Sequence, residues 1–250
     1  MSKDLVSIVI PCFNYGRFLA EAIESALDQT HDPIEVIVVD DGSTDDSAAI
    51  AAKFGSKLHY IYQENAGLCA ARNTGVKTVR GKFITFLDAD DIMDKRFVEL
   101  TVKELIEHPD ASFVYTQMRL FGREQSITQY PAYELKTLKF GNYVNASAML
   151  RAEVFQEVQY DESFKSGWED FDFYLSLGER GHYGRLLDRP LLNYRKHEAA
   201  SSMVDGINQL RQRELMLAII KKHRRLYSNR YYVRFVLDTL ILRIKSHATH

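Results

Sequence analysis

The residues with the clearest chemical potential are three carboxylates, Asp88, Asp90 and Asp91, which follow an apolar segment, Phe83–Leu87. Such a run is typical of a buried strand, and buried carboxylates are costly without a cationic partner. Alternation along an extended chain places Asp88 and Asp90 on one side, where both can face one ion. Oxygen ligands suit Mg²⁺ or Mn²⁺. The pattern therefore indicates a divalent cation, unless Asp91 only caps a helix over Asp94–His108.

Two further carboxylates, Asp40 and Asp41, follow a second apolar segment, Ile34–Val39. In a purely local interpretation, a tight turn follows Asp41, and Ser43 or Thr44 caps the next helix. That accounts for the turn but not for two adjacent acids at the end of a buried strand. Ionised aspartates accept hydrogen bonds, and a nucleoside offers donors on its base and ribose. The pair therefore favours a nucleoside-binding site.

Arg72 lies in a predicted helix of small residues, Gly67–Thr78, which suits close packing on a sheet. A guanidinium forms a planar fork that matches the paired oxygens of a diphosphate. It can equally form a salt bridge with Asp88, and the sequence leaves both interpretations open.

A later predicted helix begins with Trp168, Glu169 and Asp170. Acids in a first helical turn are favoured by the helix dipole, which gives a structural interpretation. In the functional interpretation one carboxylate is a general base and Trp168 flanks a substrate. The spacing does not choose between the two acids. His197, at the end of an extended segment, is either structural or a nitrogen ligand of the metal.

The elements that must position these residues alternate between strands and helices. Strands are predicted at 5–10, 34–39, 58–62 and 83–87, and helices at 17–29, 45–54 and 67–78. This alternation is typical of βαβ units with a parallel sheet, where ligands bind at the carboxyl ends of the strands. Both acidic clusters should therefore lie at one edge of the sheet.

The rest of the chain is less regular. The predicted elements are helices 97–108, 153–158 and 167–179, strands 111–115 and 145–151, a loop 122–133, an extended segment 186–195, and C-terminal helices 209–227 and 231–247. Pro190 restricts its segment to a sheet edge or a strand start.

The composition is that of a globular protein with one large or two small domains. The 250 residues are 46% hydrophobic and 26% charged. No apolar run approaches the roughly 20 residues of a membrane helix. No signal segment is evident, and Cys12 and Cys69 have no metal or redox spacing, so a cytoplasmic setting is expected. The net charge of −2 gives no indication of nucleic-acid binding.

Two nucleotide-binding classes are disfavoured. A dinucleotide-binding oxidoreductase needs Gly-x-Gly-x-x-Gly after its first strand, but residues 11–16 read Pro-Cys-Phe-Asn-Tyr-Gly. The phosphate-binding loop of NTPases is absent from the sequence as well. A nucleotidyltransferase stays open because it also combines an α/β sheet with carboxylates and Mg²⁺, although it has no need of residues 168–170. A non-catalytic module that binds a sugar or nucleotide also stays open.

Taken in order, these stretches resemble the family-2 glycosyltransferases of the GT-A fold. The resemblance is carried by Val6–Asn14, Val38–Asp45, Gly67–Asn73, Phe86–Asp91, Trp168–Asp170 and Tyr194–His197. It implies an α/β fold whose Rossmann-like mixed sheet has helices on both faces, plus a C-terminal helical extension. Residues 1–100 would bind the nucleotide-sugar and residues 101–204 the acceptor, while residues 205–250 form the extension.

The resemblance also implies roles for individual residues. It makes Asp170 the catalytic base, with Glu169 beside it. It makes Asp90 the main ligand of Mn²⁺ or Mg²⁺, with Asp88 and His197 as further ligands. The donor-binding residues would be Pro11, Phe13, Asn14, Asp40, Asp41, Arg72, Asp88, Ala89 and Trp168.

The implied activity is inverting transfer of a hexosyl or N-acetylhexosaminyl group from a nucleoside-diphosphate sugar, most commonly a UDP-sugar in this family. The acceptor would be a saccharide or lipid-linked saccharide, as in the assembly of cell-surface polysaccharide or glycolipid. The Gln-x-x-Arg-Trp motif and membrane helices of processive members are absent from the sequence. The resemblance therefore points to the addition of single sugars.

The last predicted helix has apolar residues at helical spacing, namely Val233, Val236, Leu237, Leu240, Ile241 and Ile244. This stripe packs on the protein's own body, on a second subunit or on an anionic membrane. Residues 206–250 contain ten Lys and Arg against two acids, a net charge of +8. The basic charge suits a peripheral position at the inner face of a membrane.

Overall fold

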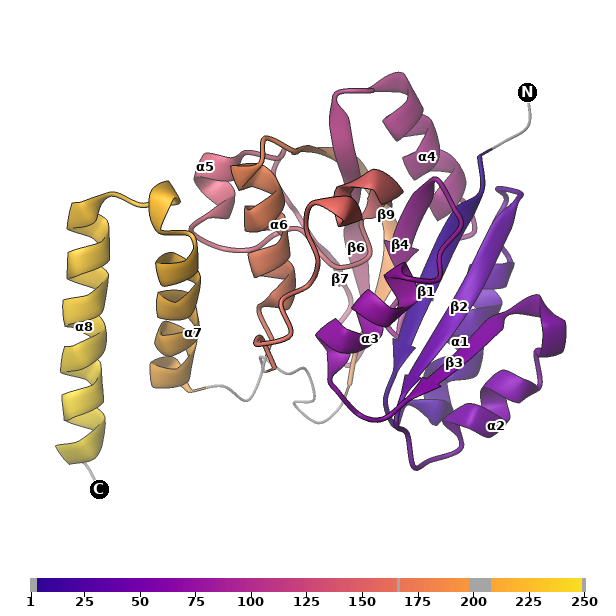
Figure 1. Ribbon diagram of the computed structural model, residues 1–250, viewed down its shortest axis with the longest axis horizontal. Helices are drawn as coiled ribbons and strands as arrows, with labels where there is room; N and C mark the ends of the chain where they lie inside the picture. The colour runs from indigo at the N-terminus through magenta and orange to yellow at the C-terminus, as the bar shows by residue number, and fades with distance from the viewer. Residues whose placement is uncertain (1–3, 166, 198–207, 249–250) are drawn as a thin grey trace.

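The computed structural model describes residues 4–165, 167–197 and 208–248. These residues form a nine-stranded mixed sheet in the order β3-β2-β1-β4-β8-β6-β9-β5, with β7 paired to β6 (Figure 1). The strands are β1 Val6–Cys12, β2 Ile34–Asp41, β3 His59–Gln63, β4 Phe83–Phe86, β5 Ile92–Met93, β6 Ala111–Gly122, β7 Ser126–Ile127, β8 Met149–Arg151 and β9 Tyr183–Lys196. The helices are α1 Gly16–Leu27, α2 Ser47–Ala52, α3 Leu68–Val76, α4 Phe97–Glu107, α5 Leu135–Leu138, α6 Glu169–Glu179, α7 Gln209–Lys222 and α8 Asn229–Ala248. The predicted α/β fold with a C-terminal helical extension is confirmed.

Parallel pairing brings the ends of the first strands to one edge of the sheet. Val9 of β1 pairs with Phe86, the last residue of β4. Cys12, the last residue of β1, pairs with Asp40 near the end of β2. The two acidic clusters follow β2 and β4, so the expectation that they share one edge is confirmed.

Helices cover both faces of this sheet. Every residue of β1 is buried, and its side chains alternate between the two faces. Val9 packs in a cluster with residues of α3 and α6, whereas Ile8 and Ile10 pack with residues of α1 and α4. Burial on both faces explains why the strand is apolar at nearly every position.

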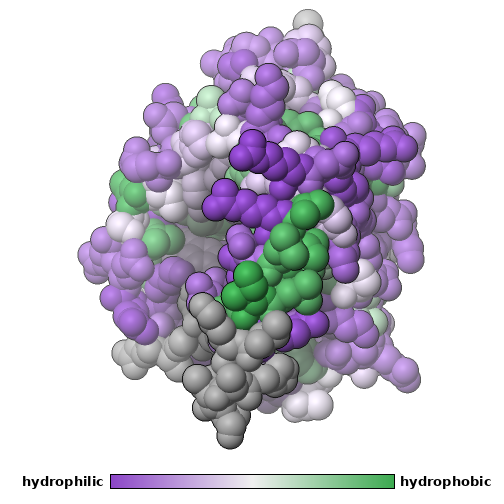
Figure 2. All heavy atoms as spheres, turned by 90° about the vertical axis from the view of Figure 1, so that its left-hand side faces the viewer, coloured by the Kyte–Doolittle hydropathy of each residue, from purple (hydrophilic) through white to green (hydrophobic). Residues whose placement is uncertain are grey.

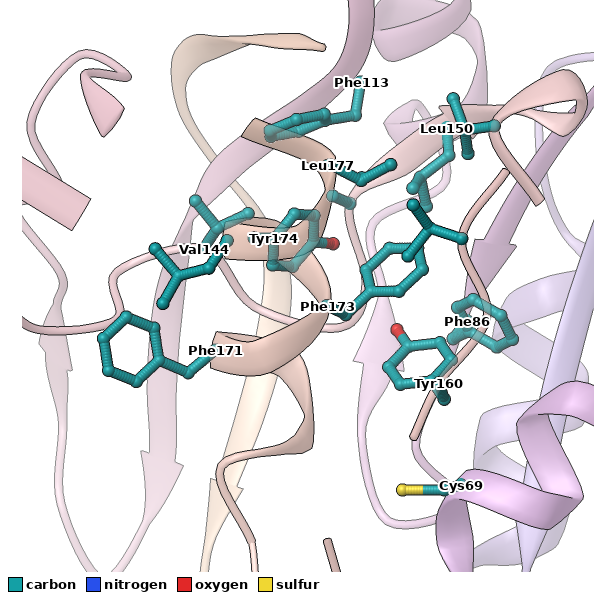
Figure 3. Close-up of a cluster of buried hydrophobic side chains, with 14 of the residues drawn as sticks. Cys69, Phe86, Phe113, Val144, Leu150, Tyr160, Phe171, Phe173, Tyr174 and Leu177 are labelled. Atoms are coloured by element: carbon teal, nitrogen blue, oxygen red, sulfur yellow. The ribbon is translucent and has the colours of Figure 1, made fainter. Parts of the chain in front are cut away.

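The cluster beneath α6 is rich in aromatic rings (Figure 3). Tyr160 stacks on Phe173 of α6 at 4.4 Å between centroids and meets Phe86 of β4 edge-on at 5.5 Å. Both arrangements suit the ring quadrupoles. The cluster thereby fixes α6, the helix that starts with Glu169 and Asp170, against the sheet.

Two prolines lie inside strands, contrary to expectation. The sequence predicted that a strand ends before Pro11 and that Pro190 lies at a sheet edge or a strand start, but Pro190 lies inside β9, between β6 and β5. β1 continues through Pro11 to Cys12, and its pairing with β4 stops at Val9. Pro11 lies beyond the part of β1 that pairs with β4, so its missing N–H costs no hydrogen bond between these two strands. Pro190 lies within β9 at a break in register, since Thr116 pairs with Leu187 and the next residue of β6 pairs with Pro190. The resulting bulge accommodates the proline.

The second half of the sheet differs most from expectation. Pairing with β9 extends β6 to Gly122, well past the predicted end at Tyr115. Within the predicted loop 122–133, the short β7 pairs with the end of β6. β8 begins at Met149 rather than at Asn145. These strands are defined by long-range pairing that local residue pattern does not encode.

The helix α7 belongs to the core. Ile219 and Ile220 are fully buried. The buried His223 directly follows the last residue of α7 and lies between two acids of α6. Its Nε2 is 3.0 Å from Oδ1 of Asp172, and its Nδ1 is 2.7 Å from Oε2 of Glu179. The first helix of the extension is thus tied to α6 by both apolar and polar contacts.

Candidate active site

A cavity of about 810 Å³ opens at the carboxyl edge of the sheet, a size within the roughly 300–1,000 Å³ of small-molecule sites. Its wall comes from the ends of β1, β2, β4 and β9, the starts of α3 and α6, and Met216 of α7. Of the residues singled out from the sequence, the lining contains Pro11, Phe13, Asp41, Arg72, Asp88, Ala89, Asp90, Trp168, Glu169, Asp170 and His197. Residues from distant parts of the chain therefore share one cavity.

Asp41 is held in a fixed orientation at one end of this cavity. Its Oδ1 accepts hydrogen bonds from Nε2 of Gln63 at 2.6 Å and from the backbone N–H of Ala66 at 2.9 Å. Its Oδ2 accepts one from the N–H of Gly67 at 2.8 Å. A carboxylate offers about four acceptor positions, so one position stays available for a ligand.

Asp40 and Asn14 lie outside the cavity lining that the described residues form. Asp40 accepts hydrogen bonds from the N–H of Ser43 at 2.8 Å and the hydroxyl of Tyr60 at 2.6 Å. Oδ1 of Asn14 accepts a hydrogen bond from the N–H of Thr44 at 2.8 Å. Both side chains therefore stabilise the turn that follows β2.

Arg72 joins three carboxylates in the wall of the cavity. Its Nη2 lies 3.1 Å from Oδ1 of Asp88, and its Nη1 lies 3.0 Å from Oε1 of Glu169 and 2.9 Å from Oδ1 of Asp170. The guanidinium is 1% exposed and lies over the ring of Tyr160 at 5.1 Å. The sequence left open whether Arg72 binds a diphosphate or forms a salt bridge with Asp88, and the salt bridge is present in the structure. The contacts with Glu169 and Asp170 were not anticipated.

One guanidinium cannot neutralise three carboxylates. Burial raises the pKa of Asp170 to about 8; Arg72 opposes the shift, while the negative charges of Glu169 and Asp88 add to it. Asp170 is therefore a carboxyl group that can exchange a proton near neutral pH, as a general base must.

The loop after β4 is clamped by the end of β9. Oδ2 of Asp90 lies 2.7 Å from Nε2 of His197, and Oδ1 of Asp91 accepts a hydrogen bond from the N–H of Arg195 at 2.8 Å. Burial and the charge of Asp88 raise the pKa of both Asp90 and Asp91. This segment therefore holds negative charge that the protein itself does not fully compensate.

The possible metal ligands in the cavity fit a divalent cation whose coordination is completed by the phosphates of a bound substrate. Among the described residues, no group of three or more His, Cys, Asp and Glu is arranged to hold a metal. Asp90 is in contact with His197, whereas Asp88 forms a salt bridge with Arg72. Seven Asp and Glu line the cavity against four Lys and Arg. Mg²⁺ typically uses one or two carboxylates plus substrate phosphates, so a surplus of acids around a two-residue site matches this type of binding.

The backbone is unusual where α6 begins. Gly167 and Trp168 both have positive φ, 87° and 72°. For a tryptophan this conformation costs on the order of 1–3 kcal/mol, and such residues cluster at functional sites. Trp168 lines the cavity, and the two residues after it, Glu169 and Asp170, reach Arg72. The strained turn thus sets the direction of both acids.

Sequence reasoning missed three cations that line the cavity, Lys165, Arg195 and Lys196. Arg195 also donates from Nε to the backbone oxygen of Asp90 at 2.8 Å. Two of the three immediately precede His197 in the chain. A pair of cations beside a candidate metal ligand was the signal that could have identified them.

The chain is similar to several glycosyltransferases in sequence. It is 31% identical over 240 residues to an uncharacterized glycosyltransferase of Rickettsia prowazekii, a match that covers 88% of this chain and 73% of that one. It is 33% identical over 190 residues to chondroitin synthase of Escherichia coli, covering 73% of this chain. It spans only 28% of that synthase, and 16% of the Streptococcus pneumoniae glycosyltransferase GlyA, to which it is 41% identical over 108 residues.

Solved structures share its architecture. S. aureus TarS 1–349 in complex with UDP-GlcNAc matches with a TM-score of 0.72 at 20% identity, covering 94% of this chain and 71% of that chain. The mannosyltransferase PcManGT from Pyrobaculum calidifontis, in complex with GDP-Man and Mn²⁺, matches with a TM-score of 0.63 at 17% identity, covering 88% and 64%. These likenesses show the GT-A fold.

The family assignment comes from a model of the sequence family itself. Residues 7–159 match the model of glycosyl transferase family 2. The match runs from β1 through β8 and includes both acidic clusters and Arg72. The chain therefore belongs to glycosyl transferase family 2.

Proposed function

We propose that this protein is a metal-dependent, inverting glycosyltransferase that moves a single hexosyl or N-acetylhexosaminyl group from a UDP-sugar to an acceptor hydroxyl. One observation carries the proposal: Asp41, Asp90 and Asp170 line the same cavity although they lie far apart in the sequence. The family and the ligands named for TarS and PcManGT support a nucleotide-sugar as donor.

The nucleoside is assigned to the end of the cavity formed by β1 and β2. Pro11 and the half-exposed Phe13 provide apolar surface for the base. The free acceptor position of Asp41 suits an imide N–H, which uracil presents. Because Arg72 is engaged by three carboxylates, we assign the diphosphate to the exposed Lys165, which lines the cavity.

Mn²⁺ or Mg²⁺ would be held by Asp90 and His197, with Asp88 nearby. When bound, the ion neutralises charge on the departing diphosphate, a Lewis-acid role worth several kcal/mol. The raised pKa of Asp90 has burial and the neighbouring Asp88 as its causes, and a cation next to the carboxylate lowers a pKa of this kind.

Asp170 is assigned as the general base and Glu169 as its support. Both acids bond to Nη1 of Arg72, but the side chain of Asp170 is 21% exposed and that of Glu169 only 7%. Asp170 would take the proton of the acceptor hydroxyl. The hydroxyl oxygen would then bond to the anomeric carbon while the bond from that carbon to the diphosphate breaks. Attack from the face opposite the leaving group inverts the anomeric centre.

The acceptor is assigned to the side of the cavity built by the second half of the chain. Its lining includes Phe140, Asn142, Asn145 and Trp168, together with Met216 of α7. Nδ2 of Asn145 is buried and has no hydrogen-bond partner among the residues that the structure describes. Aromatic and amide side chains together suit a saccharide, alone or lipid-linked, in cell-surface assembly. Met216 extends this region beyond residues 101–204.

Replacing Asp90 with alanine tests the metal and the donor together. We expect the parent chain to bind UDP much more tightly with Mn²⁺ than without it. Asp90→Ala should reduce the Mn²⁺-dependent affinity by at least about 10–100-fold, the scale seen when residues that only support a metal ligand are lost. Isothermal titration calorimetry with and without Mn²⁺ measures both values.

The control for this experiment is Asp110→Ala, which removes an exposed aspartate away from the cavity. It should bind UDP as the parent chain does. An Asp90→Ala variant whose UDP affinity keeps the full response to Mn²⁺ would contradict the assignment of the ligand.

A further inference from the structure

The helix α8 has two apolar faces, and only one of them packs on the part of the protein that the structure describes. Tyr231 and Phe235 pack against the core that includes α7. Thr239, one turn further along, is buried at 2% exposure. These three residues recur at a spacing of four, so they mark one face of the helix.

The opposite face carries the stripe predicted from the sequence. Its exposed members are Val233 at 53%, Leu237 at 53%, Leu240 at 48% and Ile241 at 51%. At 3.6 residues per turn these positions lie roughly 180° from Phe235. Packing on the protein's own body, one of the three alternatives from the sequence, is therefore wrong for these residues. The side chain of Ile244 lies outside the described residues.

Figure 2 shows this side of the molecule, where a continuous hydrophobic patch is bordered by hydrophilic residues. A contiguous apolar patch of this kind marks an interaction site rather than ordinary surface. Isolated exposed apolar residues elsewhere, such as Ile106 on α4, form no comparable stripe with a neighbour on the same helix.

The charge around the stripe is basic. Residues 206–250 carry a net charge of +8. On α8 the exposed Arg230 lies at the N-terminal end of the stripe. Arg234 lies beside the stripe with its side chain 83% exposed, 4.0 Å from Asp238. The exposed Arg225 lies just before the helix. An apolar stripe with arginines along its border is complementary to lipid tails beneath anionic headgroups.

No helix within residues 4–165, 167–197 and 208–248 has the length and apolar character needed to span a bilayer. In α8, Arg234, Asp238 and Arg243 interrupt the apolar residues. We propose that α8 lies in the plane of an anionic membrane surface, with its Val/Leu/Ile face inserted among the headgroups.

A second copy of the chain fits this face less well. Each copy of α8 carries four Lys and Arg against one Asp, so two copies repel each other when they meet, whereas an anionic surface attracts both. Stable dimer interfaces bury at least about 1,200 Å², and four half-exposed side chains per copy fall short of that area. The charge and the extent of the stripe thus both favour lipid.

If the protein has the proposed function, the position of α8 also determines how close the acceptor side of the cavity lies to the membrane. α7 lies between α8 and the cavity, because it contacts α8 on one side and contributes Met216 to the lining on the other. Docking through α8 would hold the acceptor side of the cavity one helix layer from the membrane. A lipid-linked saccharide would then reach Asp170 without leaving the bilayer.

Vesicle co-sedimentation of the full chain tests the docking without donor or acceptor, so its outcome is independent of the catalytic assignment. We expect binding to phosphatidylcholine vesicles that contain phosphatidylglycerol and weaker binding to phosphatidylcholine alone. Leu237→Gln/Ile241→Gln should lower the partition coefficient at least about tenfold. Arg230→Gln/Arg234→Gln should lower it roughly fivefold for each arginine on the anionic vesicles.

The matched control is Ile106→Gln/Ile127→Gln, which removes two exposed isoleucines outside α8. It should bind vesicles as the parent chain does, and circular dichroism should show that all variants are folded. Equal vesicle binding by the parent chain and the Leu237→Gln/Ile241→Gln variant would overturn the proposal. So would a parent chain that ignores vesicles but sediments as a dimer that this variant converts to monomer.

Discussion

The Asp170→Asn variant is expected to lose glycosyl transfer by about 10²–10⁴-fold, the usual contribution of a positioned general base. Nucleotide binding should change little, because Asp41 and Asp90 are untouched and the new amide can still accept a hydrogen bond from Arg72. Turnover of the donor with a competent acceptor measures the first quantity, and calorimetry with UDP and Mn²⁺ measures the second.

The same assignment predicts the pH dependence of the parent enzyme. Since burial raises the pKa of Asp170 to about 8, the base is protonated and inactive on the acid side of that value. The rate should therefore rise with pH through the neutral range, reach half its maximum near pH 8 and level off above that value. An exposed aspartate would give the half-maximal rate near pH 4. A rate that is constant between pH 5 and 8 would contradict this role.

Glu169→Gln is the matched comparison, because Glu169 also bonds to Nη1 of Arg72 but is more buried. We expect a smaller loss of activity in this variant, through altered placement of Asp170. If Glu169→Gln abolished transfer while Asp170→Asn retained most of it, the roles of the two acids would be reversed.

Replacing Arg72 with methionine should reduce the free energy of unfolding by about 3–5 kcal/mol, the cost of leaving buried carboxylates without their cation. Asp88, Glu169 and Asp170 would all lose a partner at 3.1 Å or less. Transfer activity should fall as well, since the base loses its orientation. Urea denaturation followed by circular dichroism gives the stability directly.

Arg80→Met is the control for this substitution. Arg80 also forms an ion pair, with Glu35 at 2.8 Å, but its side chain is 78% exposed. Exposed pairs contribute about 0–1 kcal/mol. Equal stability losses in the two variants would show that the burial of Arg72 has no energetic consequence.

The sequence predicted most of the cavity because strand ends are encoded locally. The apolar runs before Asp41 and Asp88 define β2 and β4, and parallel pairing then places both acids at one edge. Asp40 was also assigned to the cavity. Successive side chains in a strand point in opposite directions, so Asp40 and Asp41 of β2 are separated. The same alternation was expected to bring Asp88 and Asp90 together, but β4 ends at Phe86 and a turn follows, with the N–H of Asp91 donating to the backbone oxygen of Asp88 at 3.0 Å.

Other features could not be predicted from local pattern. The partners of Arg72 at the start of α6 lie 97 and 98 residues away along the chain, and the packing of α6 on the core brings them into reach. The periodicity of Val233–Ile244 predicted a helix correctly. It did not show that the opposite face of the helix, which carries aromatic residues such as Phe235, would be the face that packs against the core.

Incubation of the purified protein with a panel of nucleotide-sugars and Mn²⁺, without acceptor, shows whether the cavity turns over a sugar donor. A glycosyltransferase slowly passes the sugar to water, so we predict release of free sugar and nucleoside diphosphate from one donor, dependent on the metal and abolished in Asp170→Asn. Binding without turnover of any donor would indicate a non-catalytic module. Formation of pyrophosphate from a sugar phosphate and a nucleoside triphosphate would indicate a nucleotidyltransferase, and either result would contradict the account.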